Sequence, residues 1–141
     1  MSNSTRVLVV EDDVETQTLL KKQLASKGFE VTVASNGLDG LMQLEKSTPD
    51  VIVCDMNMPE LDGVGFVRAI KAKNETRKIP VIFLTASHDP RHMVDGINVG
   101  ARFYLTKPYE LNELIWKIQR VLGVDVGNAV NGGGSGRGGG R

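Results

Sequence analysis

Charged and hydroxyl side chains follow several apolar runs that have the composition of buried strands. Asp55 follows one such run, and three consecutive acids at 11–13 follow another. Thr85 and Lys107 stand just after two further runs. A charged group at the end of a buried segment is costly unless another group pairs with it. The repeated placement predicts that these side chains meet at one site.

The residue types at this site suit the acceptance of a phosphoryl group. Carboxylates that lie close together raise one another's pKa, and Mg²⁺, held by carboxylates, waters and a phosphate, relieves their repulsion. Asp55 would be the nucleophile, because a carboxylate can form an acyl phosphate. Lys107 would neutralise phosphoryl oxygens, Thr85 would donate a hydrogen bond, and the small Ala86 would leave room. The backbone carbonyl of Asn57 would add a metal ligand.

Five short apolar runs predict the strands that carry these residues. They are rich in Val, Ile and aromatic residues, and all but the second are nearly continuous, which is typical of strands buried on both faces. The runs are Val7–Val10, Val31–Ala34, Val51–Cys54, Val81–Leu84 and Phe103–Leu105.

Segments with helical periodicity alternate with these runs. The last is the clearest, because its apolar residues within 111–122 recur at helical spacing. The first helix is expected to end at Gly28, a residue that suits a helix C-terminus. The second helix is expected to use Leu38, Leu41 and Met42 as its apolar face.

The alternation of five strands with five helices predicts an α/β fold. It would be a doubly wound, five-stranded parallel sheet of the (βα)5 kind with helices on both faces. The carboxyl ends of parallel strands share one edge, and function lies there at a topological switch point. The acids at 11–13, Asp55, Thr85 and Lys107 would therefore converge.

Composition narrows the classes of protein that this chain can belong to. The 141 residues include 17 Lys and Arg against 17 Asp and Glu, so no overall basic charge recruits nucleic acid. No apolar run approaches the roughly 18 residues of a membrane span, and residues 1–6 lack the apolar core of a secretion signal. A single cysteine excludes an internal disulfide. We expect a cytoplasmic domain without direct contact to nucleic acid or membrane.

The C-terminal segment differs in composition from the rest of the chain. Eight of the fifteen residues at 127–141 are glycine, which predicts flexible coil. We therefore expect a domain over residues 1–124 and a Gly-rich flexible tail or linker over 125–141. Arg137 and Arg141 faintly resemble RNA-binding Arg-Gly tracts, but two arginines are a weak signal.

Four motifs at the strand ends carry a resemblance to a known family. They are V-V-E-D-D at 9–13, D-M-N-M-P-E-L-D-G at 55–63, L-T-A at 84–86 and Y-L-T-K-P at 104–108. Each is weak alone, but the four in this order are specific. Over residues 5–123 the chain resembles the CheY-like receiver domains of two-component response regulators. The resemblance implies a flavodoxin-like fold with strand order 2-1-3-4-5.

The resemblance also implies a metal-assisted phosphorylation site. Asp55 would take a phosphoryl group from a phosphohistidine on a sensor histidine kinase or phosphotransfer protein. Glu11 and Asp12 match the family's acidic pair, with Asp12 as the direct ligand, and would hold Mg²⁺ together with Asp55 and Asn57. Asp13 would instead begin the first helix, where a carboxylate suits the helix dipole.

The family's switch residues have counterparts here as well. Thr85 and Tyr104 match the pair in which the threonine moves to the phosphate and the aromatic ring turns inward. The change would reach the face formed by the fourth helix, fifth strand and fifth helix, where a downstream effector or a second copy of the chain binds. Trp116 falls off the apolar stripe of the last helix, so we place it on this partner face. A ring half-buried over a neighbouring side chain is the structural alternative.

The expected protein is a bacterial phospho-acceptor that assists its own phosphorylation and slow autodephosphorylation, and not a turnover enzyme. The alternative is a receiver fragment of a larger response regulator whose output domain followed the Gly-rich linker. A flavin or nucleotide carrier is disfavoured because the loop E-D-D-V-E-T would repel phosphate. A phosphatase is disfavoured because position 57 is Asn, which cannot act as a general acid. A pure interaction module is disfavoured by the complete set of site residues.

Three remaining residues with reactive side chains are expected to be structural. Cys54 should pack in the core, with a thiolate disfavoured by the neighbouring Asp55. His88 and His92 lack further ligands at metal-binding spacing and are expected to be surface residues.

Overall fold

A single parallel sheet organises the chain. The structure, a computed structural model, describes residues 4–58 and 61–123. Five strands lie in the order β2-β1-β3-β4-β5, and all adjacent pairs are parallel. The predicted doubly wound, flavodoxin-like (βα)5 fold is therefore confirmed. The predicted tail at 125–141, with Arg137 and Arg141, lies outside the described residues.

All five apolar runs form strands. The strands are β1 Arg6–Val10, β2 Glu30–Ala34, β3 Val51–Asp55, β4 Val81–Thr85 and β5 Phe103–Thr106. Each is one residue longer than its apolar run, because the parallel ladder continues into polar residues. Asp55 and Thr85 are thus the last residues of their strands and share in the pairing of β3, β4 and β5.

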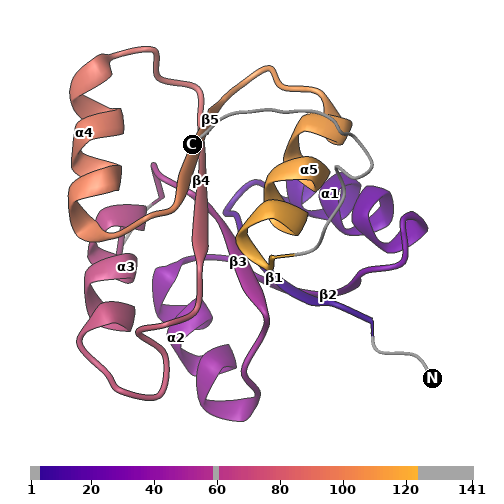
Figure 1. Cartoon of the computed structure of the whole chain (residues 1–141), viewed down its shortest axis with the longest axis horizontal. Helices are drawn as coiled ribbons and strands as arrows, with labels where there is room; N and C mark the ends of the chain where they lie inside the picture. The colour runs from indigo at the N-terminus through magenta and orange to yellow at the C-terminus, as the bar shows by residue number, and fades with distance from the viewer. Residues whose placement is uncertain (1–3, 59–60, 124–141) are drawn as a thin grey trace.

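The helices cover both faces of the sheet. They are α1 Val14–Ser26, α2 Gly37–Lys46, α3 Gly63–Lys71, α4 Pro90–Val99 and α5 Leu111–Val121. Figure 1 shows α1 and α5 on one side and α2, α3 and α4 on the other. One apolar cluster joins Leu20 and Leu24 of α1 to Leu114 and Ile118 of α5, and α3 contributes to a second cluster on the opposite face. Burial on both faces explains the nearly continuous apolar runs.

Acidic and amide side chains begin most of the helices. Asp13 accepts the backbone N–H of Thr16 and begins α1, as predicted. Asn36 and Asp62 cap α2 and α3 in the same way. Such caps satisfy N–H groups that have no partner within the helix. α1 ends at Ser26, and Gly28 follows with a φ of +96°, which fits the expected helix end.

The predicted apolar face of α2 is right for Leu41, which packs against the core, but wrong for Leu38 and Met42. Leu38 and Met42 are 51% and 60% exposed, whereas Gly40 and Leu44 are buried. A Cβ atom at Gly40 would lie 2.8 Å from the Phe66 ring, so this glycine lets α2 approach α3 closely. Glycine adds nothing to a hydrophobic pattern. Apolar periodicity therefore shows only the part of the packed face that Leu41 and Leu44 form, and not the part formed by glycine.

No helix in the described part of the chain is both long and apolar enough to cross a membrane.

Gly63, the first residue of α3, permits the close approach that positions Asp55. A Cβ atom there would lie 2.8 Å from the Asp55 carbonyl oxygen and 2.8 Å from the Met56 Cα, which are backbone atoms. We expect Gly63→Ala to lower the free energy of unfolding by about 1–3 kcal/mol, because the backbone must shift. Urea denaturation of the whole chain measures this.

Gly65→Ala is the matched control in the same helix. Its Cβ would meet the Leu61 Cδ1 at 2.8 Å, the end of a flexible side chain. Alanine also favours a helix by up to about 1 kcal/mol over glycine. Equal stability of the two variants would show that the contact with the Asp55 backbone imposes no constraint.

Candidate functional site

The carboxyl ends of the strands bring the predicted residues to one edge of the sheet. Asp55 ends β3, which lies between β1 and β4. Glu11 directly follows β1, and its N–H donates to the Ala34 carbonyl at 3.0 Å. Lys107 directly follows β5, and its N–H donates to the Thr85 carbonyl at 2.7 Å. Backbone hydrogen bonds therefore fix the acids and the lysine relative to the sheet.

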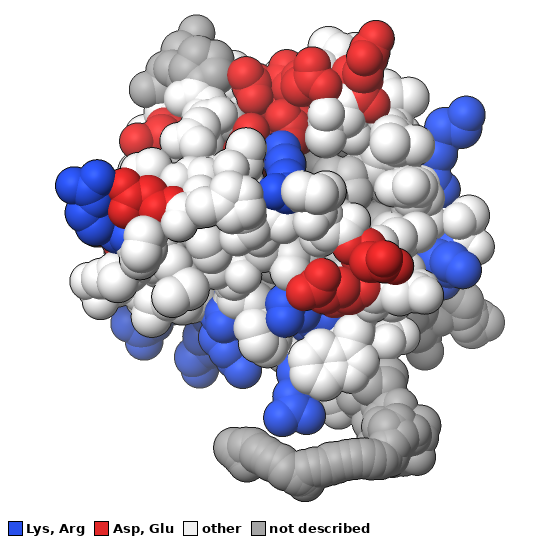
Figure 2. Space-filling view, turned by 90° about the horizontal axis from the view of Figure 1, so that it is seen from above, with Lys and Arg blue, Asp and Glu red and all other residues white. Residues whose placement is uncertain are grey.

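Three carboxylates meet at this edge. Glu11, Asp12 and Asp55 each offer an oxygen atom, and these atoms all lie within 4.8 Å of one another. On the face seen from above Figure 1, acidic side chains gather beside a basic side chain (Figure 2). Carboxylate oxygens at this spacing suit a hard divalent cation.

Glu11 is the most perturbed of these acids. It is 2% exposed, and its Oε1 has no hydrogen-bond partner in the described chain. The Lys107 Nζ lies 3.6 Å from Oε1, and the Asp13 N–H donates to Oε2 at 3.0 Å. Burial raises the pKa of Glu11 to about 7, with Asp55 adding to the rise, while the Asp13 amide and Lys107 oppose it. An unbonded buried oxygen beside two other carboxylates is a position that a cation would satisfy.

Asp55 is 8% exposed and is held by its own backbone turn. Its Oδ1 accepts the Asn57 N–H at 3.3 Å. Burial raises the pKa of Asp55, whereas Lys107 and the Asn57 amide lower it. Nearby positive charge and N–H donation favour the carboxylate, which is the form that can act as a nucleophile. The metal-binding role of the Asn57 carbonyl stays a prediction.

Thr85 and Tyr104 lie on neighbouring strands behind the acids. Thr85 is fully buried, and its Oγ1 accepts the Ser87 N–H at 3.1 Å. The Tyr104 hydroxyl oxygen is also buried and has no hydrogen-bond partner among the described residues. Burial raises the pKa of Tyr104, and the nearby Thr85 hydroxyl lowers it by a smaller amount. Ala86, next along the chain, is exposed at the edge of the site.

Gln17 supports the site and was missed in the sequence. From α1, its side-chain amide donates to the Glu11 carbonyl at 3.0 Å and approaches the Ala34 carbonyl at 3.4 Å. It therefore ties the first helix to the turn that carries the acids. A glutamine in an amphipathic helix carries no signal that distinguishes this role from exposure to solvent.

The predicted burial or exposure of the remaining reactive residues is confirmed for two of them and corrected for one. Cys54 is fully buried, and burial raises the pKa of its thiol well above the usual value, with Asp55 contributing. His88 is exposed as expected. His92 was expected to be a surface residue, but it is half-buried and its Nδ1 lies 2.6 Å from the Ser87 Oγ.

Trp116 is 44% exposed on α5, which fits both the predicted partner face and the alternative of a ring half-buried over a neighbouring side chain. Cationic groups surround its ring: the Arg120 Cζ lies 5.5 Å and the Lys117 Nζ 5.7 Å from the ring centroid. The Lys117 Nζ also lies 4.7 Å from the centroid of the Phe103 ring. The α5 and β5 surface therefore combines aromatic rings with positive charge.

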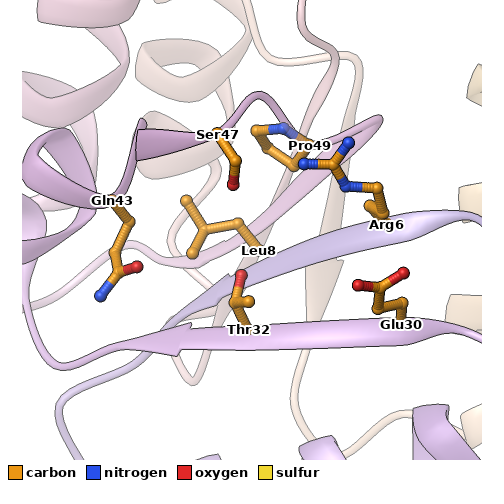
Figure 3. A pocket seen from close by; sticks show the side chains of 7 residues that line it. All are labelled: Arg6, Leu8, Glu30, Thr32, Gln43, Ser47 and Pro49. Carbon is orange, nitrogen blue, oxygen red and sulfur yellow. The ribbon is translucent and has the colours of Figure 1, made fainter. Parts of the chain in front are cut away.

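A small hollow lies at the opposite edge of the sheet, near the starts of β1 and β2. It has a volume of about 50 Å³, and Figure 3 shows the residues that line it: Arg6, Leu8, Glu30, Thr32, Gln43, Ser47 and Pro49. This volume accommodates little more than water. The hollow shares no residue with the carboxylate cluster, so the candidate site remains at the carboxyl ends of the strands.

Comparisons with known proteins agree with this geometry. The sequence profile of the response regulator receiver domain matches residues 7–119. The chain is 40% identical over 120 residues to the transcriptional regulatory protein PrrA of Mycobacterium leprae, covering 85% of this chain and 51% of that protein. It is 35% identical over 117 residues to PcoR of Escherichia coli, covering 83% and 51%. The chain thus spans about half the length of the curated relatives that it matches.

Solved structures show the same similarity. The chemotaxis protein CheY4 of Vibrio cholerae matches with a TM-score of 0.81 and 32% identity, covering 85% of this chain and 100% of that one. The receiver domain of the sensor histidine kinase PA1611 from Pseudomonas aeruginosa has a TM-score of 0.79 and 32% identity, covering 86% and 99%. That structure has a magnesium ion coordinated in its active-site cleft.

The raised pKa of Glu11 predicts an unusual dependence of stability on pH. The folded protein keeps a proton on Glu11 up to about pH 7, whereas the usual pKa is 4.5. The free energy of unfolding should therefore fall as pH rises from 4.5 to 7. Above pH 7 it should keep this lower value, because Glu11 is then charged in both the folded and the unfolded state. Without a divalent cation, we expect Glu11→Gln to raise the free energy of unfolding by about 1–3 kcal/mol at pH 8 and by almost nothing near pH 4.5.

Urea denaturation in EDTA measures this difference at each pH. Asp13→Asn is the control, since asparagine retains the helix cap and the pKa of Asp13 is lowered by the Thr16 hydrogen bonds. That variant should be less stable than the wild type, the opposite sign, and its difference should stay constant from pH 8 to 4.5, because the stabilisation by ionised Asp13 is lost only below its usual pKa of 3.8. A Glu11→Gln variant that is less stable than the wild type at pH 8 would contradict the assigned burial cost.

Proposed function

We propose that this chain, which belongs to the family of response regulator receiver domains, is a phosphoryl-accepting signalling switch. Its acceptor would be Asp55, and its donor a phosphohistidine on a sensor histidine kinase or phosphotransfer protein. The observation that carries the proposal is the cluster of three carboxylate oxygens within 4.8 Å of one another. Such a cluster, with Lys107 3.6 Å from Glu11, is poised for a cation and an incoming anionic group.

A magnesium ion would bind to Glu11, Asp12 and Asp55, with the carbonyl of Asn57 as a further ligand. The unbonded, buried Oε1 of Glu11 supports this fit, as does the magnesium in the similar receiver domain of PA1611. When bound, the ion would neutralise phosphoryl oxygens and the mutual repulsion of the acids.

The chain's own residues would then carry the transfer. An oxygen of Asp55 forms a bond to phosphorus as the bond between phosphorus and the imidazole nitrogen breaks. The imidazole leaves with the bonding electrons. Lys107 stabilises negative charge on the transferred group, the Thr85 hydroxyl donates a hydrogen bond to it, and the small Ala86 leaves room beside it. The product is an aspartyl phosphate.

The chain would act as a regulated acceptor and not as a turnover enzyme. A hydrolase that uses an aspartate nucleophile needs a general acid to protonate the leaving group. Position 57, two residues after Asp55, is an asparagine and cannot supply a proton in that way. Water would hydrolyse the aspartyl phosphate slowly, and this loss would reset the switch in the cytoplasm.

Phosphorylation would be read on the face formed by α4, β5 and α5. The new charge would draw Thr85 toward it and allow Tyr104, whose hydroxyl has no partner in the described chain, to turn inward. Three exposed apolar side chains of α4 support a partner role for this face: Met93, Val94 and Ile97. Trp116 would be the aromatic anchor on α5, since exposed aromatic residues are enriched at interfaces.

The proposed switch would work in the same way in a stand-alone protein or as one domain of a longer regulator. The curated relatives named as transcriptional regulators are about twice as long as the matched region. We propose that this chain performs the receiver role of such proteins, with a downstream effector or a second copy as its partner.

Phosphorylation of Asp55 is the central test. Incubation with Mg²⁺ and acetyl phosphate should add one phosphoryl group, measured by intact mass, and EDTA should abolish the addition. Asp55→Asn should remove it entirely. Thr85→Ala should slow it about 10-fold by loss of one hydrogen bond to a charged group, and Lys107→Ala about 100-fold by loss of charge stabilisation.

Asp62→Asn is the matched control for the loss of an acid near the site. Asparagine retains the helix cap that Asp62 provides through the Gly65 N–H at 2.8 Å. This variant should accept the phosphoryl group at the rate of the wild type. Absence of the phosphoryl group from wild-type Asp55, with Mg²⁺ and donor present, would refute the proposed function.

Trp116 tests the output face separately from the chemistry. With Mg²⁺ and beryllofluoride, an analogue of the phosphoryl group, sedimentation velocity should detect self-association of the wild-type chain. Trp116→Ala should weaken that association at least about 10-fold, because a buried aromatic anchor carries much of the energy of an interface. Leu19→Ala, a similarly exposed apolar residue on α1, should not weaken it. Unchanged association in Trp116→Ala would remove Trp116 from the partner face.

A further inference from the structure

A chain of hydrogen bonds runs from Thr85 into helix α4. The Ser87 N–H donates to the Thr85 Oγ1 at 3.1 Å, and the Asp89 N–H donates to the Ser87 Oγ at 3.1 Å. The His92 Nδ1 lies 2.6 Å from the same Ser87 Oγ. The backbone and side chain of Ser87, together with the His92 ring, thus connect the Thr85 hydroxyl to the first turn of the helix.

The His92–Ser87 contact is not needed to begin α4. Asp89 already caps this helix by accepting the Arg91 N–H at 2.9 Å. The His92 N–H donates to the Asp89 carbonyl at 3.0 Å through its backbone alone. The His92 side chain instead reaches back five residues to the loop between β4 and α4. Its contact therefore adds a constraint on Ser87 beyond the cap of the helix.

The contact between His92 and Ser87 affects Thr85 because Ser87 in turn contacts the Thr85 hydroxyl. A hydroxyl has one proton to donate and two lone pairs that accept. The Ser87 N–H occupies a lone pair of Thr85, so the Thr85 proton remains available to donate to another group. The Ser87 N–H reaches the Thr85 hydroxyl only while the loop between β4 and α4 keeps its backbone conformation. The Asp89 N–H and the His92 ring both contact the Ser87 hydroxyl, and these contacts stabilise that loop conformation.

We propose that His92 is a positioning residue: through Ser87 it holds the loop that orients the Thr85 hydroxyl toward the phosphoryl group on Asp55. This inference rests on the proposed function, because it names a residue that prepares the same site. His92 does not touch the carboxylate cluster. It makes α4 and the phosphoryl-binding hydroxyl parts of one hydrogen-bonded unit.

Two variants of His92 distinguish the effect of the hydrogen bond from the effect of the size of the side chain. Asparagine carries an amide atom where the histidine carries Nδ1, so His92→Asn keeps a partner for the Ser87 hydroxyl. His92→Leu removes that partner and keeps a side chain of similar bulk. His88→Leu is the control, since His88 is exposed on the same loop.

Amide hydrogen exchange, measured by NMR on the whole chain, tests the constraint without any phosphoryl group. We expect His92→Leu to speed exchange of the Ser87 and Asp89 amides about 3- to 10-fold, the effect of one lost hydrogen bond. His92→Asn and His88→Leu should exchange as the wild type does. Equal exchange in His92→Leu and the wild type would overturn the inference.

Affinity for beryllofluoride with Mg²⁺, measured by calorimetry, tests the consequence for the site. His92→Leu and Ser87→Ala should each weaken binding about 3- to 10-fold, and the double variant should be no weaker than Ser87→Ala alone. His92→Asn should restore the wild-type affinity. Unchanged or tighter binding in His92→Leu, additive losses in the double variant, or no rescue by asparagine would each overturn the positioning role.

The two proposals fail in different ways. If the wild-type chain binds no beryllofluoride and accepts no phosphoryl group, the proposed function fails, and the role of His92 toward a phosphoryl group fails with it. If the wild type binds and the His92 variants behave alike, only the inference about His92 fails.

Discussion

The burial of like charges at one edge of the sheet is the constraint on which the rest of the site depends. Glu11 and Asp55 are almost completely removed from water, and Asp12 lies beside them. Burial disfavours the charged forms of Glu11 and Asp55, and repulsion from neighbouring acids adds to the effect. Lys107, 3.6 Å from Glu11, offsets only part of this cost, as the raised pKa values of Glu11 and Asp55 indicate. A site of this kind gains most when a cation and then an anionic group complete its charge balance. In the proposed function, binding of such ligands would recover part of the energetic cost of folding the acids into place.

Backbone hydrogen bonds hold the charged residues in these unfavourable positions. The Glu11, Met56 and Lys107 N–H groups each donate to a carbonyl of a neighbouring strand, so the charged side chains leave from fixed positions. Gly63 allows α3 to begin against the backbone of Asp55, and Gln17 ties α1 to the turn after β1. Because these contacts are made mainly by the backbone, they constrain the position of each acid without neutralising it.

Beyond the acids, the structure connects the site to its surface in short steps. Thr85 ends β4, and the loop after it carries Ser87 and then α4. A change in the hydrogen bonds of Thr85 would reach α4 through this loop, and would reach β5 through the pairing of Thr85 with Thr106. The exposed ring of Trp116 on α5 lies among cationic side chains. A partner face there would therefore combine apolar contact with positive charge.

The sequence by itself determined the strands, their parallel order through the family motifs, and the convergence of acids, hydroxyl and lysine. The strand order is what the resemblance implies, whereas the strands and the convergence follow from local composition: strands buried on both faces are continuously apolar, and a polar residue at the end of each strand stands out against them. Only the tertiary structure decided which face of α2 is packed, since Gly40 contributes through its small size and not through hydrophobicity. It alone also decided that His92 meets Ser87 and that Gln17 meets Glu11. A polar side chain has the same pattern in the sequence whether it meets water or a partner, and only its position in the folded chain distinguishes the two.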